Sequence, residues 1–309
     1  MIIDNAGSRM VSSFAWIDHG GIWVCETATE KTRRVSLSDA KAVSLHAGRD
    51  DHFAVLHHFD GRRIELTAHA FTSPEHTLAK LIFAAGASSF EGDAEVWRHL
   101  PRTYAARYAV EGTPDYQLFT VQREGPSLKT HKLRWYDDSY DHTHQGICGV
   151  VQVPDGDLLI ISVERNSRPV LYDPATGNVE RKLDLADRNG NPVFRFRSHA
   201  AEAWVSDYDH LVRLNTKDWS VADAVCLQDA PDRHDLFVGE FAFNREETLC
   251  AVARPYSNDV VGIDTTTFEQ THCAATGGNP FEVALPGDNR VFARDLKTGD
   301  LLSGELKPT

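Results

Sequence analysis

The sequence lacks the features that would place it in a membrane or an oxidising compartment. No stretch approaches the roughly 18 consecutive apolar residues of a membrane-spanning helix, and the first residues, MIIDNAGSRM, lack the basic-then-apolar pattern of a secretion signal. Only five cysteines occur among 309 residues, without a CxxC pair, so neither a disulfide framework nor a zinc ribbon is indicated. We therefore expect a cytoplasmic protein without membrane contact.

Basic side chains are fewer than acidic ones. Lys and Arg together number 32 against 45 Asp and Glu, which gives a net charge of −13. An excess of negative charge repels the phosphate backbone of nucleic acids unless the basic residues gather on one face. We expect no nucleic-acid partner. A cation, a cationic group or a neutral ligand is easier to accommodate.

Familiar catalytic motifs are missing as well. The chain has no GxSxG, HExxH, GxxxxGK[ST] or EF-hand loop, and no GxGxxG that follows a strand. Each of these motifs marks a linear segment that carries chemistry. Any active site must therefore be assembled from residues that lie far apart in the sequence.

The sequence does contain many short apolar segments, separated by turn clusters. Segments such as HFAVLHHF, LLIISV and LFVGEFAF are rich in β-branched and aromatic residues, and clusters such as PDGD, ATGN and GGNP separate them. This pattern predicts an all-β protein. Only EHTLAKLIFAA, 75–85, fits a helix as well as a strand. The length and the 41% hydrophobic content fit one domain, 1–309, with a continuous core.

One structural part recurs in the second half of the chain. Asp173 and Asp264 each end an apolar strand, VLYD and VGID, and each is followed three positions later by a threonine. Asn215 in VRLNTKD is a weaker copy, and the spacings are 42 residues (173 to 215) and 49 residues (215 to 264). Such residues cap their own tight turns through side-chain to backbone hydrogen bonds. A period of about 40–50 residues that holds about four strands predicts β-propeller blades, about seven for this length.

The stretch SNDVVGIDTTTFEQTHCAATGGNPFEVALPGDNRVF resembles the repeat of YVTN-type propellers, which are related to the NHL and senescence-marker-protein propellers. The resemblance extends over about 141–300 and implies a propeller fold; propellers of this kind include binding proteins, lyases and hydrolases. The last blade holds only three apolar segments, FEVAL, NRVFAR and LLSGEL. We expect an N-terminal strand from MVSSFAWID, 10–18, to complete this blade and close the ring.

Histidines ahead of the first strands of blades are candidate site residues. His144 and His234 hold equivalent positions, nine residues before the end of that strand, and His199 lies near the corresponding position of the blade between them. Segments that lead into the inner strands converge at the mouth of a propeller channel. Such imidazoles, with carboxylates beside them, fit a divalent metal site or the acid and base of a proton transfer.

These positions define a predicted site. The candidate metal ligands are His144, His199, His234 and Glu240, and the candidate catalytic bases are Asp141 and His142. Glu282 aligns with Glu240 in the next blade, and each faces either the channel or the neighbouring blade. The alternative for the histidines is a structural role, in which hydrogen-bonded imidazoles tie adjacent blades together.

The sequence leaves two functions open. The first is a binding module that recognises a small molecule or a protein where the channel opens, and the absence of catalytic motifs favours it. The second is a metal-assisted lyase or hydrolase, in which a divalent ion in the channel polarises a carbonyl or activates water. A redox propeller with a quinone cofactor is disfavoured, because haem-attaching cysteines and an export signal are missing.

Trp97 lies in a segment, 88–103, that fits no blade strand and is expected to be a connecting loop or an excursion over one face.

Overall fold

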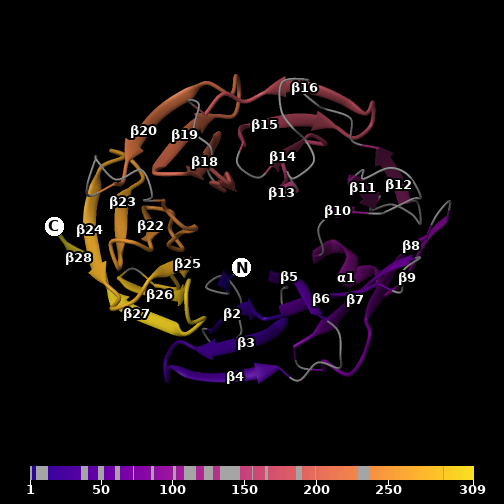
Figure 1. Ribbon diagram of the computed structural model, residues 1–309, viewed down its shortest axis with the longest axis horizontal. Coiled ribbons are helices and arrows are strands. Elements are labelled where there is room, and N and C mark those ends of the chain that lie inside the picture. The colour runs from indigo at the N-terminus through magenta and orange to yellow at the C-terminus, as the bar shows by residue number, and fades with distance from the viewer. Residues whose placement is uncertain are drawn as a thin grey trace.

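Seven antiparallel sheets stand around a central opening in the computed structural model of the chain (Figure 1). The structure describes residues 2–4, 13–35, 41–47, 52–59, 63–71, 73–84, 87–99, 102–107, 116–121, 128–132, 147–154, 156–163, 166–185, 190–198, 200–228, 237–287 and 289–309. The predicted all-β seven-bladed propeller is confirmed. No helix in these described ranges is long and apolar enough to span a bilayer.

The first three blades come from the N-terminal half of the chain. Blade 1 consists of β1 (Ile2–Asp4), β2 (Ser13–Asp18), β3 (Gly21–Glu26) and β4 (Lys31–Val35). Blade 2 consists of β5 (Lys41–Ala47), β6 (His52–Phe59), β7 (Arg63–Ala70), β8 (Ala79–Ala84) and β9 (Ala87–Gly92), and is followed by the helix α1 (Ala94–His99). Blade 3 consists of β10 (Thr103–Arg107), β11 (Tyr116–Val121) and β12 (Leu128–Lys132).

The other four blades follow in chain order. Blade 4 consists of β13 (Ile147–Gln152), β14 (Leu159–Val163), β15 (Asn166–Asp173) and β16 (Asn178–Lys182). Blade 5 consists of β17 (Val193–Phe196), β18 (Glu202–Asp207), β19 (His210–Asn215) and β20 (Val221–Cys226). Blade 6 consists of β21 (Phe241–Phe243), β22 (Leu249–Arg254), β23 (Asp259–Asp264), β24 (Gln270–Ala275) and β28 (Lys307–Pro308). Blade 7 consists of β25 (Pro280–Ala284), β26 (Arg290–Asp295) and β27 (Leu301–Glu305).

The repeated turns are built as the sequence predicts. Asp264 accepts hydrogen bonds from the backbone N–H groups of Thr266 and Thr267, both at 2.8 Å, in the turn between β23 and β24. Asp173 accepts one from the N–H of Ala175 at 2.8 Å between β15 and β16, and Asn215 has an equivalent bond in blade 5. These side chains satisfy the backbone of the turn, so each reverses the chain between the two outer strands of its blade.

Apolar side chains fill the space between neighbouring blades. Trp204 of β18 has no exposed surface and packs edge-on against Phe243 and Phe268 of blade 6, with ring centroids 5.2 and 4.8 Å apart. β22 is buried along its whole length, as expected for a strand covered by a blade on each side. The core is therefore a ring of interfaces between blades, and it holds the inner strands around the channel.

Ring closure differs from the expectation. The described part of the segment 10–18, Ser13–Asp18, forms β2, which pairs with β1 and β3 inside blade 1 and is not the fourth strand of blade 7. Among the described residues blade 7 has three strands, as predicted, and β28 leaves it to pair with β24. Rings of Phe14 and Phe292, 4.8 Å apart, instead pack across the interface between blades 1 and 7.

The strand pairing shows the secondary structure of two segments of the first half, 75–85 and 88–103, that the sequence left open. The part of 75–85 that could be helix or strand forms β8, paired to β7 and β9. The segment 88–103, expected to fit no blade strand, supplies β9 as a fifth strand and then α1. Trp97 on α1 packs against Phe90 of β9 with ring centroids 5.3 Å apart. It contributes to the core of blade 2, and the expected excursion over a face is wrong for this part of the segment.

Candidate functional site at the junction of blades 5 and 6

Most of the predicted site residues lie outside the described residues. These are Asp141, His142, His144, His199 and His234. Their roles as metal ligands or bases, and the metal-assisted lyase or hydrolase that depends on them, stay predictions. Glu240 is the one predicted ligand whose surroundings the structure describes.

Glu240 bonds blade 6 to both neighbouring blades. Its carboxylate forms an ion pair with Arg195 of β17 at 3.1 Å, and its side chain is only 18% exposed. Its backbone N–H donates to the carbonyl of Phe281 in blade 7 at 2.7 Å. Arg195 also lies over the ring of Phe241, 5.7 Å from the centroid. This geometry favours blade-to-blade bonding, because a guanidinium already occupies the carboxylate that would bind a metal.

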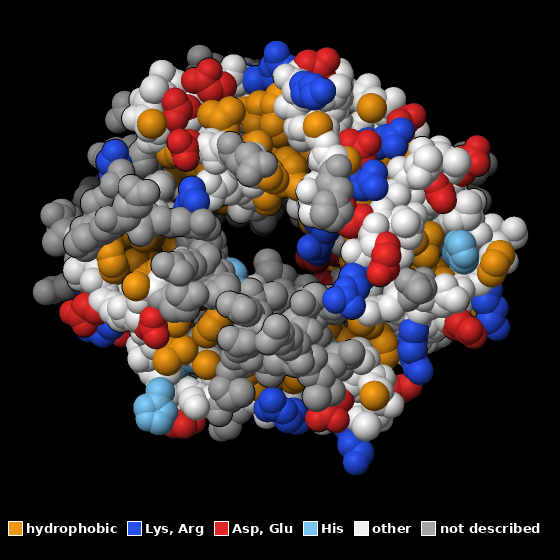
Figure 2. All heavy atoms as spheres, turned by 180° about the vertical axis from the view of Figure 1, so that it is seen from behind, with side chains coloured by type: hydrophobic (Ala, Val, Ile, Leu, Met, Phe, Trp, Pro, Cys, Tyr) orange, Lys and Arg blue, Asp and Glu red, His pale blue; other side chains and the backbone are white. Residues whose placement is uncertain are grey.

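Glu282 forms a second ion pair on the inner strands. Arg294 of β26 donates to its carboxylate at 2.9 Å, and Arg294 lies 3.8 Å from Asp18 of blade 1. Burial raises the pKa of Glu282, but the hydrogen bond from Arg294 and the positive charge around it lower the pKa further, so it lies below its ordinary value. Charged side chains of both signs line part of the central opening (Figure 2). In blades 5, 6, 7 and 1 these pairs tie neighbouring strands and blades together.

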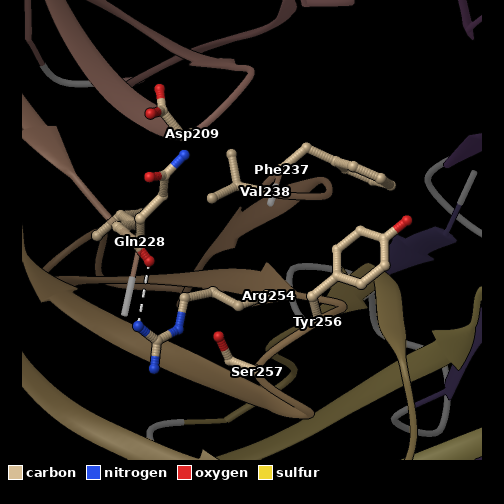
Figure 3. A pocket seen from close by; sticks show the side chains of 8 residues that line it. Asp209, Gln228, Phe237, Val238, Arg254, Tyr256 and Ser257 are labelled. Atoms are coloured by element: carbon tan, nitrogen blue, oxygen red, sulfur yellow. Dashed lines mark hydrogen bonds between the residues drawn. The ribbon is translucent and has the colours of Figure 1, made fainter. Parts of the chain in front are cut away.

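A small pocket opens where the turns of blades 5 and 6 meet (Figure 3). It is lined by Asp209, Leu227, Gln228, Phe237, Val238, Arg254, Tyr256 and Ser257. The β18–β19 turn, the segments that leave β20 and lead into β21, and the β22–β23 turn supply these residues. The enclosed part of the pocket is about 10 Å³, room for about one water molecule, which is far below the roughly 300–1,000 Å³ of small-molecule sites. The pocket is therefore a shallow depression in the surface.

Arg254 stabilises the floor of this pocket. Its guanidinium binds both carboxylate oxygens of Asp259, at 2.8 and 2.5 Å, and donates to the carbonyl of Leu227 at 3.1 Å, which is the dashed line in Figure 3. The side chain of Arg254 is only 9% exposed. Such a buried fork is rigid, because each of these bonds is charge-assisted. The pocket is therefore preformed.

Aromatic rings form one side of the pocket. Tyr256 and Phe237 pack edge-on with centroids 5.1 Å apart, and Phe237 lies 6.1 Å from Phe281 in the same way. Tyr256 is 38% exposed, and the only other exposed large hydrophobic residue in the described part of the chain is Val221. In Figure 3 the rings of Tyr256 and Phe237 lie on one side of the view, and Asp209 and Gln228 lie on the other. The site thus combines an apolar wall with polar groups opposite.

Sequence reasoning missed this pocket. Its residues come from three separate turns, and the only linear signal is a tyrosine within the polar turn RPYSND. A large ring in an exposed turn has little to pack against unless the fold provides a partner, as it provides Phe237 here.

The structure also brings together Asp209, His210 and Cys226, whose ligating atoms all lie within 4.8 Å of one another. None of these three residues was a predicted site residue.

Comparisons with known proteins support the fold. No family profile matches the chain, and no curated protein does, so the resemblance to YVTN and NHL repeats stays a prediction. The structure is similar to the β-propeller domain of Cps50 (Swd1) from Myceliophteria thermophila, with a TM-score of 0.66 and 13% identity over 97% of this chain and 94% of that one. It is also similar to a chain of the mitotic checkpoint complex, with a TM-score of 0.57 and 8% identity over 98% and 88%. The chain has the fold of a seven-bladed β-propeller.

Proposed function

We propose that this protein is a cytoplasmic binding module that recognises a protein partner at the pocket between blades 5 and 6. The observation that carries the proposal is the exposed ring of Tyr256 at the edge of a preformed pocket. Tyrosine is enriched among the residues that dominate binding energy at protein interfaces, especially beside well-packed pockets. The structural neighbour in the mitotic checkpoint complex belongs to a protein assembly, which is consistent with this function.

The geometry favours one type of contact. Phe237, Val238 and Tyr256 supply an apolar wall, and Gln228 and Ser257 supply hydrogen-bonding groups at the rim. An apolar side chain of a partner would pack on the exposed ring of Tyr256 over this shallow pocket, while its backbone would bond to the polar rim. The rings lose little conformational entropy on binding, since Phe237 is already packed between Tyr256 and Phe281.

The proposal is tested with a displayed library of random peptides. Peptides selected on the purified wild-type protein are measured by isothermal titration calorimetry against the wild type, Tyr256→Ala and Val221→Ala. Val221 on β20 is a matched control, because it is also an exposed large hydrophobic residue, 46% against 38% exposed. We expect Tyr256→Ala to raise the Kd at least about 30-fold, as at an interface hot spot, and Val221→Ala to leave it within about twofold.

Two results would contradict this function. One is a library that yields no binding peptide. The other is a set of peptides whose Kd is the same for the wild type, Tyr256→Ala and a second variant, Phe237→Ala. Because Tyr256 also packs against Phe237, the unfolding temperature of each variant is measured beside its Kd, and a lost interaction counts as lost binding only where the variant is folded at the temperature of the assay.

A further inference from the structure

The outer hairpin of blade 5 places three different metal-binding groups together. His210 is the first residue of β19 and Cys226 is the last residue of β20, and the two are direct cross-strand partners. Partners that lie opposite one another in an antiparallel pair point to the same face, with Cβ atoms about 4.5–5.5 Å apart. Asp209 precedes His210 in the turn, and its carboxylate is hydrogen-bonded to Nδ1 of His210.

The backbone holds this arrangement in place. The N–H of Leu227 donates to the carbonyl of Asp209 at 2.9 Å, and the N–H of Val238 donates to the carbonyl of Tyr208 at 2.6 Å. Tyr208 itself adopts a φ of 52°, in the left-handed region, which turns the chain so that Asp209 and His210 follow side by side. The turn is thus tied both to the end of β20 and to the segment that leads into blade 6.

We propose that Asp209, His210 and Cys226 form a binding site for Zn²⁺. An imidazole nitrogen, a thiolate sulfur and a carboxylate oxygen are the three ligand types that this ion binds, and the thiolate disfavours the harder Mg²⁺ and Ca²⁺. All three ligating atoms lie within 4.8 Å of one another, so small side-chain rotations bring them around one ion. Cys226 is exposed, which gives the ion a path from solvent.

The site has the composition of an open zinc centre. Three protein ligands leave one of four tetrahedral positions for water or for a group from a partner. Asp209 also lines the pocket between blades 5 and 6, so the ion would lie at the edge of that pocket. This inference goes beyond the proposed function, which depends on Tyr256 and does not require a metal.

The test measures metal binding by the full chain after chelation and removal of the chelator. Zn²⁺ affinity is determined by competition with a chromophoric chelator, and Co²⁺ is used as a spectroscopic probe, because a thiolate ligand gives Co²⁺ an intense charge-transfer absorption. We expect this absorption in the wild type and its loss in Cys226→Ser. We expect His210→Ala to weaken Zn²⁺ binding at least about 10-fold, the lower limit seen even for groups that only support a ligand.

Matched controls separate this site from other histidines and thiols. His76 also bonds to an adjacent carboxylate, Glu75, at 3.1 Å, and the metal-ligand groups found in the described part of the chain do not include it. His76→Ala and Cys273→Ser should therefore bind Zn²⁺ like the wild type. The double variant His144→Ala/His234→Ala tests the metal site predicted from the sequence.

Three results would overturn the assignment. They are a Co²⁺ complex without thiolate absorption, Zn²⁺ affinity unchanged in both Cys226→Ser and His210→Ala, and affinity lost only in His144→Ala/His234→Ala. A measurement on the wild type removes any dependence on how the variants fold. Zn²⁺ should slow alkylation of Cys226 by iodoacetamide, as followed by peptide mass spectrometry, and an unchanged rate at saturating Zn²⁺ would also refute the site.

Discussion

Removal of Arg294 should destabilise the propeller far more than removal of a surface arginine on the same strand. Arg294 and Glu282 are 18% and 8% exposed at their side chains, so their ion pair is largely shielded from water. Substitution of one partner leaves the other charge buried, which costs about 3–5 kcal/mol. Arg290 on the same strand pairs with Glu30, but these side chains are 51% and 45% exposed, and such pairs contribute about 0–1 kcal/mol.

The free energy of unfolding of Arg294→Met and Arg290→Met is measured by urea denaturation between pH 4 and pH 7. In the wild type, the pKa of Glu282 is lowered, so its contribution is present above the unfolded pKa of about 4.3 and is lost as the pH falls through the folded value. In Arg294→Met, the hydrogen bond and the charge of Arg294 are lost while burial remains, so the pKa of Glu282 should rise relative to the wild type. The deficit should therefore be largest at pH 7 and shrink as Glu282 takes up a proton.

A double variant tests whether the buried charge of Glu282 causes the loss of stability in Arg294→Met. Glu282→Gln in the Arg294→Met background removes the buried charge, so it should restore part of the stability that Arg294→Met loses at pH 7. If Arg294→Met costs no more than Arg290→Met at pH 7, or if its deficit does not depend on pH, the assignment of a shielded ion pair is wrong.

Three further predictions concern single positions. Burial lowers the pKa of His46 to about 4, so stability should fall as the pH drops from about 6.5 toward 4; His46→Gln should remove this dependence in urea titrations. A Cβ at Gly239 would lie 2.2 Å from the carbonyl oxygen of Phe281, whereas Gly287 has no atom within 4 Å. By thermal denaturation, Gly239→Ala should cost about 1–3 kcal/mol and Gly287→Ala less than about 0.5 kcal/mol. Trp204→Ala should cost about 3–5 kcal/mol in urea unfolding.

Local turn chemistry explains why the second half of the fold could be predicted. Asp173, Asn215 and Asp264 cap their turns through hydrogen bonds within three residues, so the sequence contains the whole interaction. In the described part of the first half, blade 1 has a related turn, in which Thr29 donates to the carboxylate of Glu26 at 3.0 Å, but glutamate in place of Asp or Asn makes it harder to recognise in the sequence. Trp97 is half-buried and packs against Phe90, but β9 and α1 are held by contacts with the strands of blade 2, which a pattern of single residues does not show.

The candidate metal site shows a different limit of sequence reasoning. The turn after Asn215 is recognisable in the sequence. The backbone N–H of Asn215 donates to the carbonyl of Ser220 at 2.9 Å. Regular pairing from that bond would place Val225 opposite His210. A bulge between Arg213 and Leu214 shifts the register by one residue and brings Cys226 opposite His210 instead. A shift of one residue exchanges the faces of a strand, so the thiol meets the imidazole only because of a bulge that the sequence does not announce.

Ring closure depends on side chains in this propeller. In the described residues, blades 1 and 7 share no strand; instead Phe14 and Phe292 pack across their interface and Arg294 reaches Asp18. The same kind of interface, apolar rings with ion pairs on the inner strands, joins blades 5 and 6 through Trp204 and Glu240. Closure therefore uses the interaction that joins the other blades, and it leaves β1 as an inner strand beside the channel (Figure 1). A hydrogen-bonded fourth strand was expected because exposed edges are costly, but Leu306 is buried in a core cluster with Ala274 of β24, and the residues after it pair with β24 of blade 6.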